Sequence, residues 1–424
     1  MLQLSYLANH TQEAIEKLAK KNFDAQEIVA AILSLDQSRR SHQAHLDQSL
    51  NESNALAKEI GSLLKENKTA EAQQAKTKTA ELKEQVKGYK EKLDADQLAL
   101  DNLLVTLPNI PHHSVPQGKT PEQNEIIATH GTIPTLHSGA QPHWELCQKY
   151  KLIDFELGVK ITGAGFPVYR GKGAKLQRAL INFFLDNAEQ AGYLEIQPPI
   201  LINKASGFGT GQLPDKDGQM YYAGIDELYL IPTAEVPVTN IYRDVIVKES
   251  ELPIKNAAYT PCFRREAGSY GKDVRGLNRL HQFDKVEIVQ VAHPKNSYEV
   301  LEEMQQYVAS LLQKLGLPYR ILRLCGGDMS FTSALTYDFE VYSTAQERWL
   351  EVSSVSNFET YQTNRLKLRY KSDTDGKNHL AHTLNGSALA LPRIVASILE
   401  NYQTPDGITV PSALVPYTGF ELIN

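Results

Sequence analysis

The sequence predicts an α+β fold, in which a domain built on a largely antiparallel sheet flanked by helices follows an N-terminal antiparallel helical hairpin. The hairpin is predicted because residues 24–104 contain no proline and only two glycines, and are rich in Ala, Glu, Lys, Gln and Leu, which favour helices. The sheet domain is predicted because short apolar runs typical of strands alternate with helical patterns after residue 142, without an internal repeat. A chain of 424 residues is long enough for two such units.

Two seams of mostly apolar or small residues, spaced alternately by three and four positions, indicate the two helices of the hairpin. They comprise Leu46, Ser49, Ser53, Leu56, Ile60 and Leu63, and then Leu82, Val86, Tyr89, Leu93, Asp96, Leu100 and Leu103. The polar segment 65–69 between them predicts a tight reversal. A helix of about 40 residues would be roughly 60 Å long.

The surface of this hairpin has two interpretations. It carries lysines interleaved with acids, namely Lys65, Lys68, Lys76, Lys78, Lys83, Lys87, Lys90 and Lys92. Such a run is usually a solvated face. The serines and the aspartate weaken the seams, and a dimerising coiled coil or a spacer is the alternative function for the hairpin. The same lysines would equally suit contacts to a phosphate backbone without base readout. The pattern alone leaves both interpretations open.

Net charge, cysteine content and hydropathy indicate which partners and which compartment to expect. The formal net charge is −6, so a nucleic-acid partner would require a local basic surface. Three cysteines stand far apart, which argues against a disulfide framework or a structural zinc site and favours a reducing compartment. We find no secretory signal at the N-terminus, and the most apolar run, residues 388–399, is too short and interrupted to span a membrane. The cysteines are Cys147, Cys262 and Cys325.

After the hairpin, residues 108–142 are rich in Pro, His, Thr and Gly and predict a linker. Helices are expected over residues 174–192 and 297–315, the second ended by Gly316. Strands are expected over residues 228–231, 257–265, 283–291, 339–342 and 349–353.

Two strand-like segments carry charged groups suited to a nucleotide. Alternation predicts that Arg264 and Glu266 share one face, where an arginine can bind a phosphate and a glutamate can accept from a base amine. Phe283, Lys285 and Glu287 share another face, and an exposed Phe beside charges indicates a surface on which a ligand stacks. The alternatives are a cross-strand ion pair for the first segment and an ordinary half-buried strand for the second.

Three further segments are open to a ligand interpretation. Thr233 and Glu235 can hold an ammonium group, although a helix N-terminal cap is the alternative. Glu351, followed by serines over residues 353–356, suits magnesium, although a polar strand end is the alternative. We expect residues 384–398 to form a helix with small residues leading to Arg393, where a core helix is the alternative.

In this order after a helical hairpin, these segments resemble bacterial seryl-tRNA synthetase, a class II aminoacyl-tRNA synthetase. The most specific stretches are residues 209–214 (Gly-Thr-Gly-Gln-Leu-Pro), 263–276 and 351–370. The resemblance covers nearly the whole chain and implies the class II antiparallel sheet with a coiled-coil arm. Residues 1–107 would form the tRNA-binding helical arm, and residues 108–424 the catalytic domain, with residues 108–142 as a linker at its start. Residues 192–199, 263–266 and 386–393 resemble the three class II motifs, of which the first would build a homodimer interface.

The resemblance also implies roles for individual residues. The serine-binding residues would be Thr233, Ala234, Glu235, Glu287, Asn385 and Ser387. The ATP-binding residues would be Arg264, Arg265, Glu266, Phe283, Glu351, Val352, Ser353, Ser354 and Arg393. Arg264 and Arg393 would be catalytic, at the α- and γ-phosphates respectively. Glu266 would contact the adenine amine and Phe283 would stack on the ring. Glu351 and Ser354 would serve ATP through Mg²⁺.

The implied activity is formation of seryl-adenylate from L-serine and ATP, followed by transfer to the 3′ end of tRNA(Ser), and of tRNA(Sec) where present. It needs no covalent enzyme intermediate, because positioning and charge stabilisation supply the catalysis. The implied protein is a cytoplasmic homodimer without a membrane partner. Two rivals are a ligase that charges a carrier protein, whose members lack the arm, and an inactive paralogue, which loss of Arg264, Glu266 or Arg393 would mark.

Two residues depart from the family pattern. Arg265 stands where a small residue such as Ser is common, and we expect it only to add charge. Pro392 precedes Arg393 where Gly is usual, and a proline inside the helix expected there would kink it.

Overall fold

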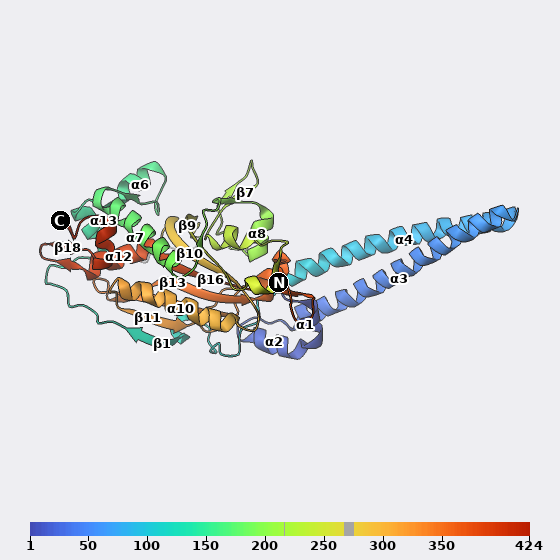
Figure 1. Cartoon of the computed structure of the whole chain (residues 1–424), viewed down its shortest axis with the longest axis horizontal. Helices are drawn as coiled ribbons and strands as arrows, with labels where there is room; N and C mark the ends of the chain where they lie inside the picture. Colours follow the sequence, from blue (N-terminus) through green and yellow to red (C-terminus); the bar gives the residue numbers. More distant parts are fainter. Residues whose placement is uncertain (216, 267–274) are drawn as a thin grey trace. The chain divides into compact units, whose positions relative to one another are not determined.

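The computed structural model describes residues 1–215, 217–266 and 275–424. The chain divides into two compact units (Figure 1). One unit contains Leu2–Ala19 and Phe23–Pro108. The other contains Met1, Lys20–Asn22 and Asn109–Asn424.

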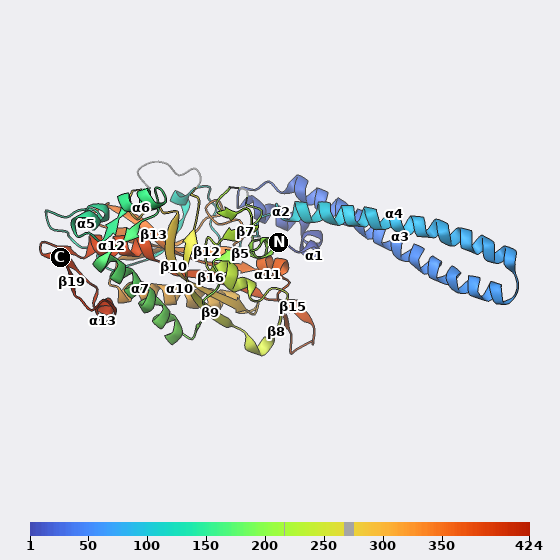
Figure 2. The ribbon, with the colours of Figure 1, turned by 90° about the horizontal axis from the view of Figure 1, so that it is seen from above.

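The first unit is helical and confirms the predicted hairpin. Its helices are α1 (Leu4–Asn9), α2 (Thr11–Ala19), α3 (Gln26–Lys65) and α4 (Thr69–Leu104). Figures 1 and 2 show α3 and α4 side by side. Leu46 and Ser49 of the first seam and Leu82 and Leu100 of the second are buried between them. The hairpin therefore uses the spacing of its seams for packing.

The polar residues in the seams have partners of their own. Asp96 accepts a hydrogen bond across the hairpin from His42, with 2.9 Å between Oδ2 and Nδ1. Asp36 of α3, which lies before the first seam, is buried and accepts from the guanidinium groups of Arg39 and Arg40. These contacts supply hydrogen-bond partners for carboxylates that are partly or fully removed from water.

The second unit is built on an eight-stranded sheet with the strand order β1-β11-β12-β13-β16-β10-β9-β4. Neighbours pair antiparallel, except that β4 pairs with β9 in parallel. The strands are β1 (Glu125–His130), β4 (Leu194–Glu195), β9 (Ile254–Phe263), β10 (Gln282–Ala292), β11 (Tyr319–Arg323), β12 (Leu335–Ser343), β13 (Arg348–Glu359) and β16 (His382–Ala390). The predicted α+β class and antiparallel sheet are confirmed.

Helices pack on this sheet and close its core. The three longest in this unit are α7 (Gly171–Gln190), α10 (Ser297–Lys314) and α12 (Leu391–Asn401), and all three contact sheet strands. Leu176, Leu180, Phe183 and Phe184 form the buried face of α7. Gly316 follows α10 with φ +64°, a conformation that glycine adopts readily at the end of a helix.

Shorter elements complete the unit. The remaining helices are α5 (His143–Lys149), α6 (Phe155–Ile161), α8 (Lys204–Thr210), α9 (Glu235–Asn240), α11 (Thr360–Leu366) and α13 (Val415–Thr418), with 3-10 turns at Pro121–Gln123, Glu249–Glu251 and Ser412–Leu414. The remaining strands are β2 (Ile153–Asp154), β3 (Val168–Tyr169), β5 (Leu201–Ile202), β6 (Tyr222–Ala223), β7 (Leu228–Leu230), β8 (Ile246–Lys248), β14 (Arg369–Lys371), β15 (Asn378–Leu380), β17 (Gln403–Thr404), β18 (Gly407–Thr409) and β19 (Leu422–Ile423). Within the part of the chain that the structure describes, these strands form four small sheets.

Three local expectations differ from the structure. Residues 384–390, expected to begin a helix, belong to strand β16, because they lie between β10 and β13 and are covered on both faces, where a strand becomes almost continuously apolar or small. Helix α12 therefore begins only at Leu391, and Pro392 falls in its first turn, where a missing N–H costs nothing and no kink results. The stretch expected to be a linker contributes the edge strand β1.

Over the described ranges, we find no helix that combines the length and the apolar character needed to cross a membrane.

Candidate active site

Two buried carboxylates and a partly buried amide form a cluster where α9, β10 and β16 meet. Asn385 on β16 donates from Nδ2 to Oε2 of Glu235 (2.8 Å) and to Oε1 of Glu287 (2.9 Å). Ser387 pairs directly with Glu287 across the two strands, and its hydroxyl donates to Glu287 Oε2 (3.3 Å). Residues separated by 150 positions therefore share one hydrogen-bond network. Four of the predicted serine-binding residues are members of it.

The charges in this cluster are only partly balanced. Lys285 Nζ lies 2.7 Å from Glu287 Oε2, and both side chains are buried. Glu235, which is equally buried, receives amide hydrogen bonds. Burial, and then the neighbouring Glu287 carboxylate, raise the pKa of Glu235 to about 7. A cationic group placed beside these two acids would relieve this repulsion.

Glu235 is held by residues that the sequence did not indicate. Gln362 on α11 donates from Nε2 to Glu235 Oε1 (2.7 Å) and to the Thr210 carbonyl (3.2 Å). Thr383 donates from Oγ1 to Gln362 Oε1 (2.7 Å), which fixes the orientation of the amide. Thr233 Oγ1 accepts from the Glu235 backbone N–H at 3.2 Å. Thr233 precedes the N-cap of α9, which is the buried Ala234, and α9 has no side-chain cap hydrogen bond.

Arg264 lies next to the aromatic ring predicted to stack on adenine. Its guanidinium carbon is 5.2 Å from the centre of the Phe283 ring, a cation–π arrangement. Its Nε donates to the Pro232 carbonyl (3.4 Å), which brings it towards the segment that carries Glu235. Arg265 lies instead over the ring of Tyr221, at 5.6 Å.

The prediction that Arg264 and Glu266 alternate on one strand is wrong. Strand β9 ends at Phe263, and Glu266 has φ +49°. The Glu266 carboxylate pairs with Arg279. Residues 267–274, which belong to a stretch that carried the resemblance, lie outside the described residues.

A second group of predicted residues gathers where β12, β13 and α12 adjoin. Arg393 donates from Nη1 to the Glu351 carbonyl (2.6 Å), and its Nη1 lies 3.7 Å from the Glu351 carboxylate. Val352 and Ser353 are buried, and Ser353 donates from Oγ to the carbonyl of Ser387. That hydrogen bond joins β13 to β16, the strand that carries Asn385 and Ser387 of the first cluster.

Asp338 is a carboxylate at this place that the sequence did not reveal. It faces Ser354 across β12 and β13, and its Oδ1 is buried without a hydrogen-bond partner among the described residues. Burial, and then the nearby Glu351, raise the pKa of Asp338 well above its usual range, while a hydrogen bond with Ser354 opposes the shift. A divalent cation beside these oxygens would favour the ionised carboxylate.

The donor set is hard oxygen throughout, which suits a cation such as magnesium. Within residues 1–215, 217–266 and 275–424, no group of three or more His, Cys, Asp or Glu residues is arranged to hold a metal by itself. An ion at this place would therefore rely on a few side-chain oxygens and on ligands brought by another molecule. Phosphate oxygens are the usual source of such ligands.

Comparison with known proteins adds to this geometry. Residues 222–402 match a family model described as the tRNA synthetase class II core domain (G, H, P, S and T). Residues 1–111 match one described as the Seryl-tRNA synthetase N-terminal domain. A curated protein named Serine--tRNA ligase from Salinibacter ruber is 50% identical over 425 residues, which cover 100% of this chain and 99% of the relative.

The chain belongs to the seryl-tRNA synthetase family. Two solved structures share its fold. The seryl-tRNA synthetase from Pyrococcus horikoshii complexed with ATP is 31% identical and superposes with a TM-score of 0.89, covering 100% of this chain and 99% of that one. The cytoplasmic Serine-tRNA ligase from Naegleria fowleri in complex with AMP is 27% identical with a TM-score of 0.87, covering 99% and 97%.

Proposed function

We propose that this protein is an ATP-dependent serine--tRNA ligase, which activates L-serine as seryl-adenylate and transfers it to the 3′ end of tRNA(Ser). The observation that carries the proposal is the cluster of Glu235, Glu287, Asn385 and Ser387. Its Glu235 carboxylate suits an ammonium group, and its Glu287 carboxylate, beside the Asn385 amide and the Ser387 hydroxyl, suits a second, neutral polar group. Where the cell has tRNA(Sec), we propose that it is charged with serine as well.

Serine selection follows from what each group would do. Glu235, with Thr233 beside it, would accept hydrogen bonds from the ammonium group of serine. Glu287, oriented by Asn385 and Lys285, would accept from the serine hydroxyl. Alanine would leave these buried acceptors unpaired, and a site of this kind can reject such an analogue by about four orders of magnitude. Threonine would be refused by its extra methyl group.

ATP binding is assigned to the flanking residues. We propose that Phe283 stacks on the adenine ring and that Glu266 accepts from its exocyclic amine after release from Arg279. Arg264 would bind the α-phosphate and Arg393 the γ-phosphate, as planar donors that match phosphate geometry. The buried segment Val352–Ser353 would act by holding the strand beside the nucleotide, and Arg265 by adding positive charge.

Magnesium is the proposed metal ion, held by Glu351 and Ser354 together with phosphate oxygens of ATP. The hard-oxygen donors and the raised pKa of Asp338 support this assignment, and we add Asp338 to the residues that bind the ion directly or through water. When bound, the ion would neutralise phosphate charge that builds up as pyrophosphate leaves.

The protein's own residues contribute position and charge. Glu235 and Glu287 would hold serine so that its carboxylate meets the α-phosphorus in line, with Arg264 contacting both the α-phosphate and the serine carboxylate from the side. A P–O bond forms to the serine carboxylate while the bond to the leaving pyrophosphate breaks. Arg393 would stabilise the departing phosphates. The terminal ribose hydroxyl of the tRNA then attacks the carbonyl carbon and releases AMP.

Two assignments concern larger surfaces. We propose that α3 and α4 bind the transfer RNA by shape and phosphate contacts, which their interleaved lysines support. We also propose a homodimer formed through residues 192–199. There, Leu194 is 66% exposed on β4, at the edge of the sheet, where an uncovered apolar residue favours pairing with a second copy. The three free, buried cysteines are consistent with action in the reducing cytoplasm.

Charging of tRNA tests the proposal. The purified protein, given ATP, Mg²⁺ and radiolabelled serine, is expected to attach serine to tRNA(Ser) and not to a tRNA of another specificity. Stable attachment of serine to a carrier protein, with none to tRNA(Ser), would overturn it.

A further inference from the structure

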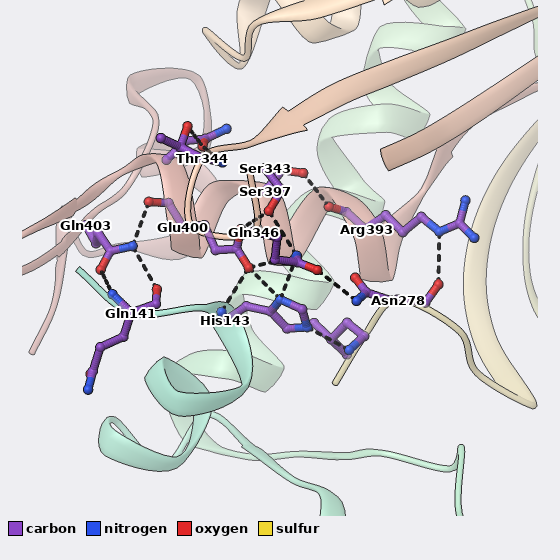
Figure 3. A network of polar contacts seen from close by, with 12 residues as sticks. Gln141, His143, Asn278, Ser343, Thr344, Gln346, Arg393, Ser397, Glu400 and Gln403 are labelled. Atoms are coloured by element: carbon purple, nitrogen blue, oxygen red, sulfur yellow. Dashed lines mark hydrogen bonds and ion pairs between the residues drawn. The ribbon is translucent and has the colours of Figure 1, made fainter. Parts of the chain in front are cut away.

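A buried polar network links α5 to α12 and extends to Arg393 (Figure 3). At its centre, His143 and Glu400 are both fully buried. Oε1 of Glu400 accepts from the His143 backbone N–H (3.0 Å), from His143 Nδ1 (2.7 Å) and from Gln346 Nε2 (3.0 Å). Its Oε2 accepts from the Ser343 hydroxyl. A buried carboxylate is thus satisfied without an arginine or lysine.

The hydrogen bonds of His143 define which ring nitrogen carries the proton. Its Nε2 accepts from the backbone N–H of Leu277 at 2.8 Å, so Nε2 presents its lone pair and Nδ1 donates to Glu400. Gly276 precedes this contact with φ +66°, and a Cβ there would lie 2.2 Å from His143 Nε2. Only glycine fits so close to the imidazole. The chain at residues 276–277 is therefore fixed by a side chain more than 130 positions earlier.

A second branch reaches the proposed phosphate-binding arginine. Gln346 accepts on Oε1 from Nδ2 of Asn278 (2.9 Å). The backbone carbonyl of Asn278 in turn accepts from Nε of Arg393 (3.1 Å). Both branches, through His143 and through Gln346, therefore converge on two consecutive residues, Leu277 and Asn278.

The two ends of this network also share one helix. Arg393 and Glu400 are seven positions apart on α12, which places them on the same side of it. Helix α12 therefore carries both Arg393 and Glu400. Glu400 anchors residues 277–278, and the carbonyl of Asn278 in turn holds Arg393. An arginine side chain loses much conformational entropy when it is held in one rotamer. Because the Asn278 carbonyl already holds Arg393, less of this entropic cost has to be offset by the free energy of ATP binding.

We propose that His143, Glu400 and Gln346 are positioning residues for ATP, which act by holding Leu277–Asn278 so that the Asn278 carbonyl orients Arg393. This inference rests on the proposed function, because it takes Arg393 to bind the γ-phosphate. It assigns a role in nucleotide binding to residues that do not touch the nucleotide.

Two amide replacements of His143 separate its two hydrogen bonds. In His143→Asn the amide nitrogen occupies the place of Nδ1 and still donates to Glu400, but Leu277 loses its acceptor. In His143→Gln the amide oxygen occupies the place of Nε2 and still accepts from Leu277, while the hydrogen bond to Glu400 is lost. Serine-dependent exchange of pyrophosphate into ATP, measured with each substrate varied in turn, reports the two KM values.

The expected pattern is selective for ATP. His143→Asn should raise the KM for ATP roughly two- to tenfold, the effect of about one hydrogen bond, and leave the KM for serine unchanged. His143→Gln should lie closer to the wild type. Gln346→Ala, which cuts the other branch, should also raise the KM for ATP, and it serves as the test should His143→Asn not fold.

The matched control is Gln403→Ala. Gln403 donates to the carbonyls of Glu400 and Gln141, both at 2.9 Å, and among the described residues its side-chain hydrogen bonds do not reach residues 277–278. It should lower the melting temperature without changing the KM for ATP. The inference is overturned if His143→Asn and Gln346→Ala leave the KM for ATP unchanged or raise both KM values equally. Absence of serine-dependent exchange in the wild type would refute the proposed function instead.

Discussion

Glu235 gives the sharpest test of how the amino group of the substrate is recognised. Replacing it by Gln keeps its size and removes its charge. The lost interaction is a charge-assisted hydrogen bond to an ammonium group, worth about 1.5–3 kcal/mol. We therefore expect kcat/KM for serine to fall by roughly ten- to a hundredfold, and the KM for ATP to stay within about twofold, since Glu235 lies with the serine cluster.

The same residue predicts a pH dependence with a defined sign. Burial and the facing Glu287 raise the pKa of Glu235 to about 7, while Gln362, Lys285 and Arg264 oppose that shift. Below pH 7 the carboxyl group is protonated and neutral, so its attraction for an ammonium group is lost. Because kcat/KM reports the ionisation of the free enzyme, it should fall about tenfold between pH 8 and pH 6 in the wild type.

Steady-state pyrophosphate exchange, measured at several pH values, tests both the expected loss of kcat/KM for serine and its expected pH dependence. The Glu235→Gln variant should be slower and should lack the acid limb near pH 7. Thr383→Val is the matched control, because it removes a hydrogen bond to Gln362 and leaves the carboxylate in place. If Glu235→Gln kept the wild-type kcat/KM for serine, or kept the limb near pH 7, our account of ammonium recognition would be wrong.

Three further predictions concern the arm, the metal and the dimer. Replacing residues 53–85 by a short turn should lower tRNA charging by on the order of a hundredfold, because phosphate contacts are lost. Serine-dependent pyrophosphate exchange should be unchanged. Equal tRNA charging by the wild-type and truncated proteins would contradict this role for the hairpin. Chelation of divalent ions should abolish exchange, and Ser354→Ala should raise the Mg²⁺ concentration needed to restore it, which a magnesium titration measures; an unchanged requirement would count against Ser354 as a ligand. Leu194→Asp should shift the mass seen by light scattering from two copies towards one; a monomeric wild type, or an intact variant dimer, would argue against this edge as the interface.

Local periodicity predicted the fold where one face of an element is buried and the other is not. The seams of α3 and α4 and the apolar side of α7 are of this kind, since their buried residues recur with the helix repeat. It was wrong over residues 384–390 because a strand covered on both faces has no alternation, and its small and apolar residues resemble a buried helix. Arg264 and Glu266 were misread for a different reason, because strand β9 ends just before them.

The site was predictable only in part, again for a physical reason. Glu235, Glu287 and Asn385 carry charge or amide groups within segments whose order resembles a known family. The roles that we propose for Gln362, Asp338 and His143 depend on contacts with residues elsewhere in the sequence, and no local pattern marks them. Asp338 in particular is exceptional only because an oxygen is buried without a partner among the described residues.

The central claim is that Glu235, Glu287, Asn385 and Ser387 select serine. It is tested most directly by measuring amino-acid-dependent exchange of pyrophosphate into ATP across serine, alanine, glycine, cysteine and threonine. We predict exchange with serine and, at equal concentration, a rate lower by about four orders of magnitude with alanine. Exchange with another of these amino acids and none with serine would contradict the account.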